Sequence, residues 1–226
     1  MSQPKRQLSR GAVLSLLSVT IALPVGDPSG WQIDRYSRIA PHGTRFAQDE
    51  LRIHVRKSAS PIIRALPGGP LKITGFKVEG EFKGLPVFAN VKKQGQKGAD
   101  DFALRLGFIV PGDKKLSGLK KTFAPEWIKR LYEKVPEGSG IDHVRFFAMV
   151  QNPELVGKSR RHPSSELLRE DFVALVQAPG PFTFTHQLAE PLQAGAVWLS
   201  TDGDDTRSDF TVVIKKIELL TEPSAR

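Results

Sequence analysis

The sequence predicts an all-β protein, an antiparallel β-sandwich of the jelly-roll type with one short surface helix inserted between strands. From Trp31 onward, short stretches of alternating apolar and polar residues recur, and clusters of Pro, Gly and Asp separate them. Their spacing allows about eight to ten strands. The 226 residues suffice for one large domain, and 39% hydrophobic and 25% charged residues are ordinary globular fractions.

The first 25 residues resemble a secretory signal peptide. Lys5, Arg6 and Arg10 precede an uncharged, mostly apolar run over residues 11–25. This run is shorter than the roughly 20 residues that span a bilayer. We therefore expect a signal peptide over 1–25, one domain over 26–226, no transmembrane segment, and a periplasmic or secreted protein. Because no clear small-x-small cleavage triplet follows, an apolar first strand behind a basic tail is the alternative.

The strands before the helix are read from alternation. Residues 102–110 place five apolar side chains on one face, and Arg105 on the other with Asp101 just ahead of it. Residues 144–151 are apolar on both faces, which indicates a central strand. Three earlier strands are expected at residues 51–55, 62–66 and 71–82.

One helix and two further strand pairs complete the predicted fold. Phe123, Trp127 and Leu131 are spaced for a helix of about three turns over residues 122–135. Residues 172–176 and 182–188 flank a Pro/Gly-rich turn and form either a hairpin or a crossover between sheets. Residues 197–201 and 210–219 are expected to pair around an acidic loop.

The acidic loop is the most distinctive stretch. Four aspartates occupy eight positions between two strands: Asp202, Asp204, Asp205 and Asp209. Carboxylates at this density repel unless they are solvated or neutralised, and Ca²⁺ takes six to eight oxygen ligands from such loops. The spacing is not that of an EF-hand. Calcium binding is one interpretation; the other is a hairpin loop whose carboxylates cap backbone amides.

Three more residues are candidate ligand-binding positions. Asp101 and Arg105 share one strand face with the small Ala103 between them, so they can hold a sugar hydroxyl pair or a carboxylate, or pair with each other. Trp198 lies four residues before Asp202 and can stack on a sugar ring if exposed. A buried tryptophan is the more common case. Trp31, Trp127 and Tyr36 are further candidates for stacking.

Catalysis is not favoured by any motif. The chain contains no cysteine, which excludes disulfides, thiol catalysis and Cys-ligated metals. Its five histidines lie far apart, and neither a nucleophile elbow nor a phosphate-binding glycine loop is present. A glycosidase pair that uses Asp101 and a later aspartate stays open.

The basic excess is local. The formal net charge is +9, and the stretch 90–134 holds 11 Lys and Arg against five acids. This patch suits a polyanion of the cell envelope, or it serves only solubility. Export disfavours nucleic acid as the partner. A shorter basic cluster at residues 158–162 is interpreted as a loop.

Two motifs resemble a known family. The stretch Asp100-Asp101-Phe102-Ala103-x-Arg105 leads into an apolar strand, and Thr201-Asp202-Gly203-Asp204-Asp205-Thr206 precedes a final strand. Together they resemble a family of exported bacterial proteins of unknown function with a galactose-binding-like jelly roll. The chain departs from it in a Lys-rich insertion with a helix at 113–135. The resemblance implies a fold and a compartment, and no activity.

The function expected from these observations is that of an exported, non-catalytic binding module for carbohydrate or another anionic envelope component, with calcium as the possible cofactor. The first alternative is a polysaccharide hydrolase with paired carboxylates. The second is a structural or interaction protein of the envelope that uses the basic region.

Overall fold

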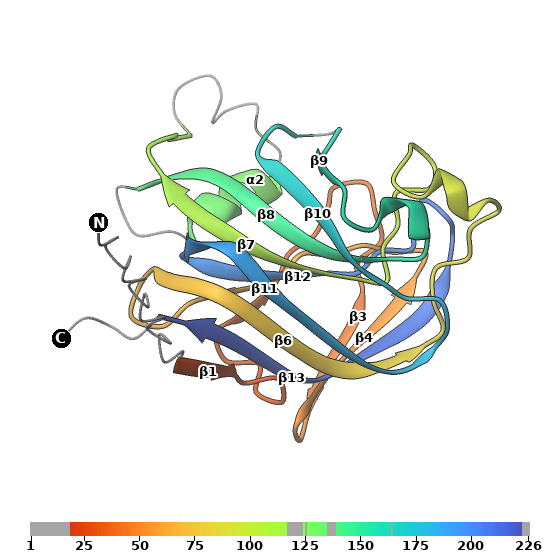
Figure 1. Cartoon of the computed structure of the whole chain (residues 1–226), viewed down its shortest axis with the longest axis horizontal. Helices are drawn as coiled ribbons and strands as arrows, with labels where there is room; N and C mark the ends of the chain where they lie inside the picture. The colour runs from red at the N-terminus through yellow and green to blue at the C-terminus, as the bar shows by residue number, and fades with distance from the viewer. Residues whose placement is uncertain (1–18, 117–123, 125, 135–138, 164, 223–226) are drawn as a thin grey trace, which may run out of the picture.

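Two β-sheets packed face to face form the molecule, which confirms the predicted β-sandwich (Figure 1). The computed structural model describes residues 19–116, 124, 126–134, 139–163 and 165–222. These residues contain thirteen strands, one α-helix and two short 3₁₀ helices.

The first sheet has six strands. Its order is β11 (Gly180–Ala194), β6 (Leu71–Lys83), β13 (Asp209–Thr221), β4 (Glu50–Arg56) and β3 (Gly43–Ala47), and β1 (Val19–Leu23) pairs with the end of β13. All pairs in this sheet are antiparallel.

The second sheet has seven strands. Its order is β2 (Trp31–Ile33), β5 (Ile62–Ala65), β12 (Ala196–Ser200), β7 (Leu104–Gly112), β8 (Gly140–Val150), β10 (Leu168–Leu175) and β9 (Ser159–Arg161). The basic cluster at 158–162, interpreted from sequence as a loop, therefore contains the edge strand β9. The central position expected for residues 144–151 is confirmed, because β8 lies between β7 and β10.

Consecutive strands often change sheets, as in a jelly roll. β4, β5, β6 and β7 alternate between the first and second sheet, and so do β10 and β11. The turn at residues 178–181 is thus a crossover rather than a hairpin. The expected pairing of residues 197–201 with 210–219 is wrong, because β12 and β13 lie in different sheets.

One pair departs from the expected antiparallel pattern. β8 and β10 run parallel, with Arg169 beside Arg145. A parallel pair needs a connection of about a dozen residues or more, and residues 151–167 supply it. This connection holds the 3₁₀ turn η2 (Pro153–Leu155) and β9, which is antiparallel to β10.

The main core lies between the sheets, and period-2 alternation sends other residues to the outer faces. In β7, Leu104, Leu106 and Phe108 belong to the core between the sheets, while Arg105 and Ile109 point the other way. The outer face of the second sheet is itself partly buried.

The helix α2 (Glu126–Tyr132) covers that outer face. Ile128 and Leu131 are buried there against Ile109, Val144 and Trp198. The structure confirms the inserted helix, although its bounds are narrower than 122–135. Residues 122, 123, 125 and 135 of the predicted helix lie outside the described part of the chain. So do Lys120 and Lys121 of the basic stretch 90–134.

The strand β1 lies in the last part of the expected signal peptide. It pairs with β13 from Val19 opposite Thr221 to Leu23 opposite Ile217. Leu23 and Val25 are buried in the core, and the Trp31 indole donates to the Pro24 carbonyl at 2.7 Å. This is the arrangement of the alternative first strand; cleavage and export stay predictions, and residues 1–18 lie outside the described part. The described residues contain no helix with the length and apolar composition of a membrane span.

Removal of residues 1–25 should therefore destabilise the domain. The two buried side chains at 23 and 25 contribute about 1.5–3 kcal/mol each, so we expect the melting temperature to fall by about 10 °C. The matched control lacks only residues 1–18 and keeps β1. Equal melting temperatures of the two truncated chains would show that β1 does not support the sandwich.

Candidate functional site

A cavity of about 540 Å³ opens on the outer face of the second sheet, beside α2. It brings together six of the seven sequence-predicted site residues: Asp101, Arg105, Trp198, Asp202, Asp204 and Asp205. Asp209 lies elsewhere, exposed at the start of β13 and beside a different depression with His54.

The sheet supplies the floor of this cavity. Arg105 of β7, Phe146 of β8, Leu168 of β10, and Trp198 and Ser200 of β12 line it and lie on the outer face. The other walls come from loops and α2. Tyr36 and Ile39 follow β2, Trp127 lies on α2, and the aspartates lie in the loops before β7 and after β12.

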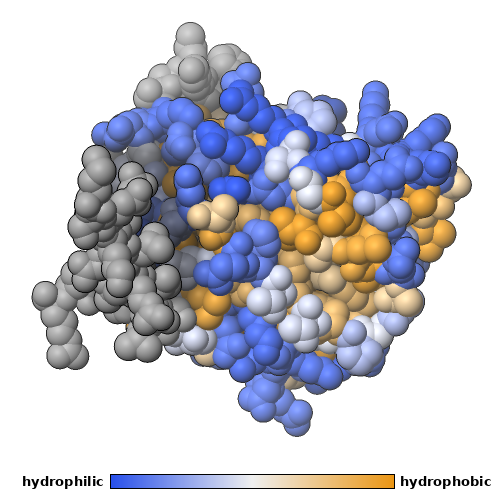
Figure 2. Space-filling model, in the orientation of Figure 1, coloured by the Kyte–Doolittle hydropathy of each residue, from blue (hydrophilic) through white to orange (hydrophobic). Residues whose placement is uncertain are grey.

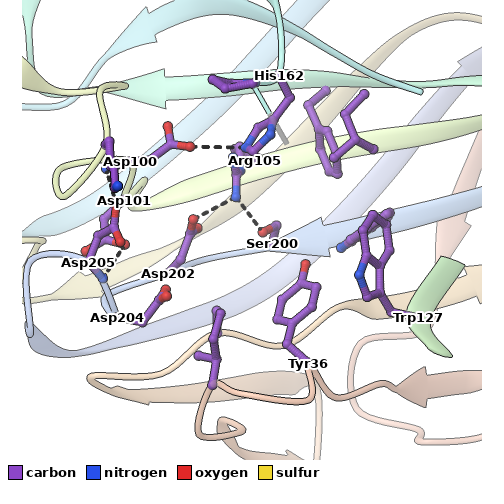
Figure 3. A pocket seen from close by; sticks show the side chains of 17 residues that line it. Tyr36, Asp100, Asp101, Arg105, Trp127, His162, Ser200, Asp202, Asp204 and Asp205 are labelled. Carbon is purple, nitrogen blue, oxygen red and sulfur yellow. Dashed lines mark hydrogen bonds and ion pairs between the residues drawn. The ribbon is translucent and has the colours of Figure 1, made fainter. Parts of the chain in front are cut away.

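Arg105 is the centre of the polar end (Figure 3). Its two terminal nitrogens donate to Glu170 at 2.7 Å and to Asp202 at 2.7 Å, and a third bond of 3.1 Å reaches Ser200. The guanidinium also lies 4.7 Å from the centre of the Phe102 ring. Burial works to lower the pKa of Arg105, but Asp202 and Glu170 outweigh it and raise the pKa. The group is permanently charged.

A second arginine continues this network. Glu170 is fully buried, and its other oxygen accepts a 2.6 Å hydrogen bond from Arg160 of β9. Arg160 also pairs with Asp100 at 2.5 Å, and the second oxygen of Asp100 lies 3.1 Å from His162. Two guanidiniums and three carboxylates thus form one connected network on β7, β9, β10 and two loops; Arg105, Glu170 and Asp202 are buried, and Arg160 and Asp100 are half-buried.

Asp101 holds the acidic loop and does not pair with Arg105. Its carboxylate accepts hydrogen bonds from the Thr206 amide at 2.7 Å, the Thr206 hydroxyl at 2.5 Å and the Asp205 amide at 3.3 Å. The ion pair between Asp101 and Arg105, which the sequence left open as one alternative, is therefore wrong. The partners of Arg105 are Glu170 and Asp202 instead.

Asp205, in the loop after β12, binds in return the loop before β7. One of its oxygens accepts hydrogen bonds from the Gly98 and Asp100 amides, both at 3.0 Å. The loops before β7 and after β12 are thus joined by carboxylates that cap backbone amides. For Asp205, this is the role that the alternative interpretation of the acidic loop assigned; Asp101, which lies outside that loop, has the same role without having been predicted to.

The four loop aspartates do not form one metal site. Asp209 is remote, one oxygen of Asp205 is taken up by amides, and one oxygen of Asp202 is paired with Arg105. Among the described residues, no group of three or more His, Asp or Glu side chains is arranged to hold a metal ion. Calcium binding stays a prediction.

Several polar atoms at the cavity have no partner in the described part of the chain. They are one carboxylate oxygen of Asp202, Nε of Arg105 and the indole nitrogen of Trp198, all fully buried. Buried polar atoms normally have a partner, so these three are exceptions, and a ligand or water reaches them only when neighbouring side chains shift. Burial, assisted by the charge of Asp101, raises the pKa of Asp204 to about 6. Burial also raises the pKa of Asp202 well above its usual value, against the pull of Arg105.

The other end of the cavity is aromatic. The ring of Trp127 meets those of Tyr36 and Trp198 edge to face, with ring centres 5.8 Å and 5.9 Å apart. The ring centres of Phe146 and Trp198 are 5.0 Å apart. Trp198 is only 1% exposed, which confirms the core interpretation, whereas Tyr36 and Trp127 are half-buried. Figure 3 shows the Tyr36 hydroxyl pointing toward Ser200 and Asp202.

Helix α2 and the Tyr36 loop are held together by an ion pair of 2.8 Å between Arg130 and the buried Asp34. Trp31, a further stacking candidate, lies in the core between the sheets and takes no part in the cavity. Sequence reasoning missed Glu170, Arg160 and Asp34. A fully buried glutamate in a strand gives no sequence signal until its partners on other strands are known.

Glu170→Gln should destabilise the domain strongly. The variant removes the negative charge that the buried Arg105 and the half-buried Arg160 share, and breaking a buried ion pair costs about 3–5 kcal/mol. We expect thermal unfolding about 10 °C lower than in the parent chain. The control is Glu154→Gln, because Glu154 makes only an exposed pair with Lys92 at 3.6 Å. If Glu170→Gln lowers the melting temperature no more than Glu154→Gln does, the network does not stabilise the domain.

Asp204→Asn should stabilise the folded chain above pH 6. Because the folded-state pKa of about 6 exceeds the ordinary 3.8, ionised Asp204 opposes folding at high pH, and this penalty fades as the pH falls from about 6 to 3.8. Solvent screening of the half-buried side chain leaves a penalty of about 1 kcal/mol. The melting temperature at pH 7.5 should rise by about 2–4 °C, and at pH 4 it should change little. A drop at pH 7.5 would contradict this prediction.

No family model and no curated protein matches this chain. Solved structures with a similar outline include "xylan-binding module CBM15", with 12% identity, a TM-score of 0.37, and coverage of 92% of this chain and 99% of that chain. Another is the "VIP36 exoplasmic/lumenal domain, Ca2+/Man3GlcNAc-bound form", with 9% identity, a TM-score of 0.36, and coverage of 92% and 89%. At such low identities and TM-scores, the likeness bears on neither the ligand nor the site of this chain.

Proposed function

We propose that this chain is a carbohydrate-binding protein and that the cavity beside α2 takes one end of a neutral saccharide. The observation that carries this proposal is the pairing of an aromatic wall with unpartnered polar atoms in one small cavity. Sugar rings present apolar faces that pack on aromatic side chains and hydroxyls that bond to carboxylates and guanidiniums at their edges. The volume of about 540 Å³ is in the range of small-ligand pockets, about 300–1,000 Å³.

The charge of the cavity favours a neutral ligand over an anionic one. Five aspartates line it against two permanent cations, Lys97 and Arg105. Arg105 is already neutralised by Glu170 and Asp202. An added anion would meet uncompensated carboxylates, because Asp204 has no cationic partner in the described residues.

Hydrolysis by Asp101, the enzymatic alternative, loses its main residue. A general acid or nucleophile needs a carboxylate that can reach the substrate. Both oxygens of Asp101 accept hydrogen bonds from the loop at 205–206. The proposal is therefore binding without catalysis. A periplasmic or extracellular location stays an expectation from the composition of residues 1–25, of which Val19–Leu23 pair with β13.

Asp204→Asn should weaken saccharide binding. The variant removes a charged acceptor, which contributes about 1.5–3 kcal/mol, so affinity should fall about 10-fold or more. We would screen neutral gluco-, xylo-, manno- and galacto-oligosaccharides on a glycan array and measure hits by calorimetry at pH 7.5, with calcium and with a chelator. Asp209→Asn is the matched control, since Asp209 is exposed and outside the cavity.

Tyrosine provides a second matched pair, because the chain contains only Tyr36 and Tyr132. Tyr36→Phe removes one hydroxyl at the cavity and should weaken binding by up to about 10-fold, while Tyr132→Phe should not change it. A blank array in both metal conditions, or equal losses in each pair, would overturn the proposal. Binding that disappears with the chelator would assign calcium a role.

A further inference from the structure

Three arginines stand side by side on the opposite face of the same strands. Arg161 of β9 is the register partner of Arg169 of β10, and Arg169 is the partner of Arg145 of β8. Register partners on adjacent strands point to the same face, with Cβ atoms about 5 Å apart. Arg160 and Glu170, one residue away, point to the outer face and belong to the buried network. The arginine row therefore lies on the inner face.

This row stands where the second sheet extends past the first. Strands β10 and β9 are the last two of the second sheet, and β11, the edge of the first sheet, contacts β7. Arg145 lies 5.3 Å from the centre of the Phe147 ring, at the margin of the core between the sheets. Figure 2 shows hydrophilic side chains gathered above an apolar band on this face.

The positive charge of the row is largely uncompensated. Asp171 pairs with Nε of Arg145 at 2.7 Å and accepts a hydrogen bond from the Ser159 hydroxyl. Arg161 and Arg169 are exposed, and among the described residues they make no hydrogen bond or ion pair. Three guanidiniums against one carboxylate leave a local charge of about +2, and like charges directly opposite each other on a sheet destabilise it.

A depression of about 440 Å³ accompanies the row and is lined by Arg145, Ser159, Arg161, Arg169 and Asp171, together with Arg160 and Glu170. Arginine forks match the oxygens of phosphate and sulfate groups through paired hydrogen bonds. Two neighbouring guanidiniums can hold one such group, and the dianion would offset the local charge.

We propose that the arginine row is a second binding site, which takes a phosphate or sulfate group. The site shares no lining residue with the saccharide cavity, although Arg160 and Glu170, which also line the depression, belong to the network behind that cavity. It differs from the basic stretch 90–134, whose residues do not line it. Charged side chains at a sheet edge also prevent edge-to-edge association, and this role alone would need no ligand.

The test measures binding of inorganic phosphate, inorganic sulfate, glucose 6-phosphate and glucose 6-sulfate by calorimetry at low ionic strength. Saturable binding to the parent chain is expected, and Arg169→Gln should weaken it about 10-fold. The control is Arg45→Gln, which removes an exposed arginine from β3 at the far edge of the other sheet and changes the net charge equally. Tighter binding of the sugar esters than of the free ions would assign the group to a saccharide.

Equal affinity in Arg169→Gln and Arg45→Gln, or no saturable binding to the parent chain, would overturn the proposal. Should Arg169→Gln fail to fold, Arg161→Gln on the edge strand makes the same test. Self-association of either variant with anion binding unchanged would leave only the edge-protecting role. Tyr36→Phe should not alter anion binding and Arg169→Gln should not alter neutral-saccharide binding, so the two proposals fail separately.

Discussion

The outer face of the second sheet depends on one carboxylate, that of Glu170, which is fully buried between two guanidiniums. Arg105 and Arg160 each take one of its oxygens, which ties β10 to β7 and to β9. Through their second partners, Asp202 and Asp100, the same two arginines hold the loops that form the polar end of the cavity. Removing charges from water is costly, and attraction offsets this only when every group keeps its partners. The loops therefore have little freedom to move while the network is intact.

This network decides which side chains are left for a ligand. Asp101 and Asp100 are occupied by amides and by arginine, as is one oxygen of Asp205, so these groups hold the two loops in place. What stays available is the Asp204 carboxylate, the second oxygen of Asp205 and the aromatic wall, while one oxygen of Asp202 and Nε of Arg105 are unpartnered but buried. A small acidic, aromatic cavity results in a protein whose net charge is +9. The overall charge is thus a poor guide to the ligand of this site.

Alternation along β9 and β10 separates two environments on neighbouring residues. Arg160 and Glu170 face outward into the buried network, whereas Arg161, Arg169 and Asp171 face inward to the open margin of the sandwich. Neighbouring basic residues of one short segment therefore have different roles: Arg160 is half-buried and paired, and Arg161 is exposed without a partner among the described residues. The sequence reading of residues 158–162 as a loop missed this, because a three-residue strand shows too little periodicity and its pairing with β10 is not local.

The sequence by itself determined the class of fold and the inserted helix, and it singled out Arg105 and the acidic loop as candidates without placing them together. Apolar alternation and turn residues are local properties, and they specify strands wherever one face must be buried. Only the tertiary structure decided which strands pair, that β8 and β10 run parallel, that Asp101 caps a loop while Arg105 binds Glu170, and that Asp209 lies apart. These outcomes depend on contacts between distant residues: Arg105 and Glu170 are 65 positions apart in the chain, and Asp101 and Thr206 are 105 apart. Such contacts are selected by packing and by the demand that buried charges find partners, which no local pattern records.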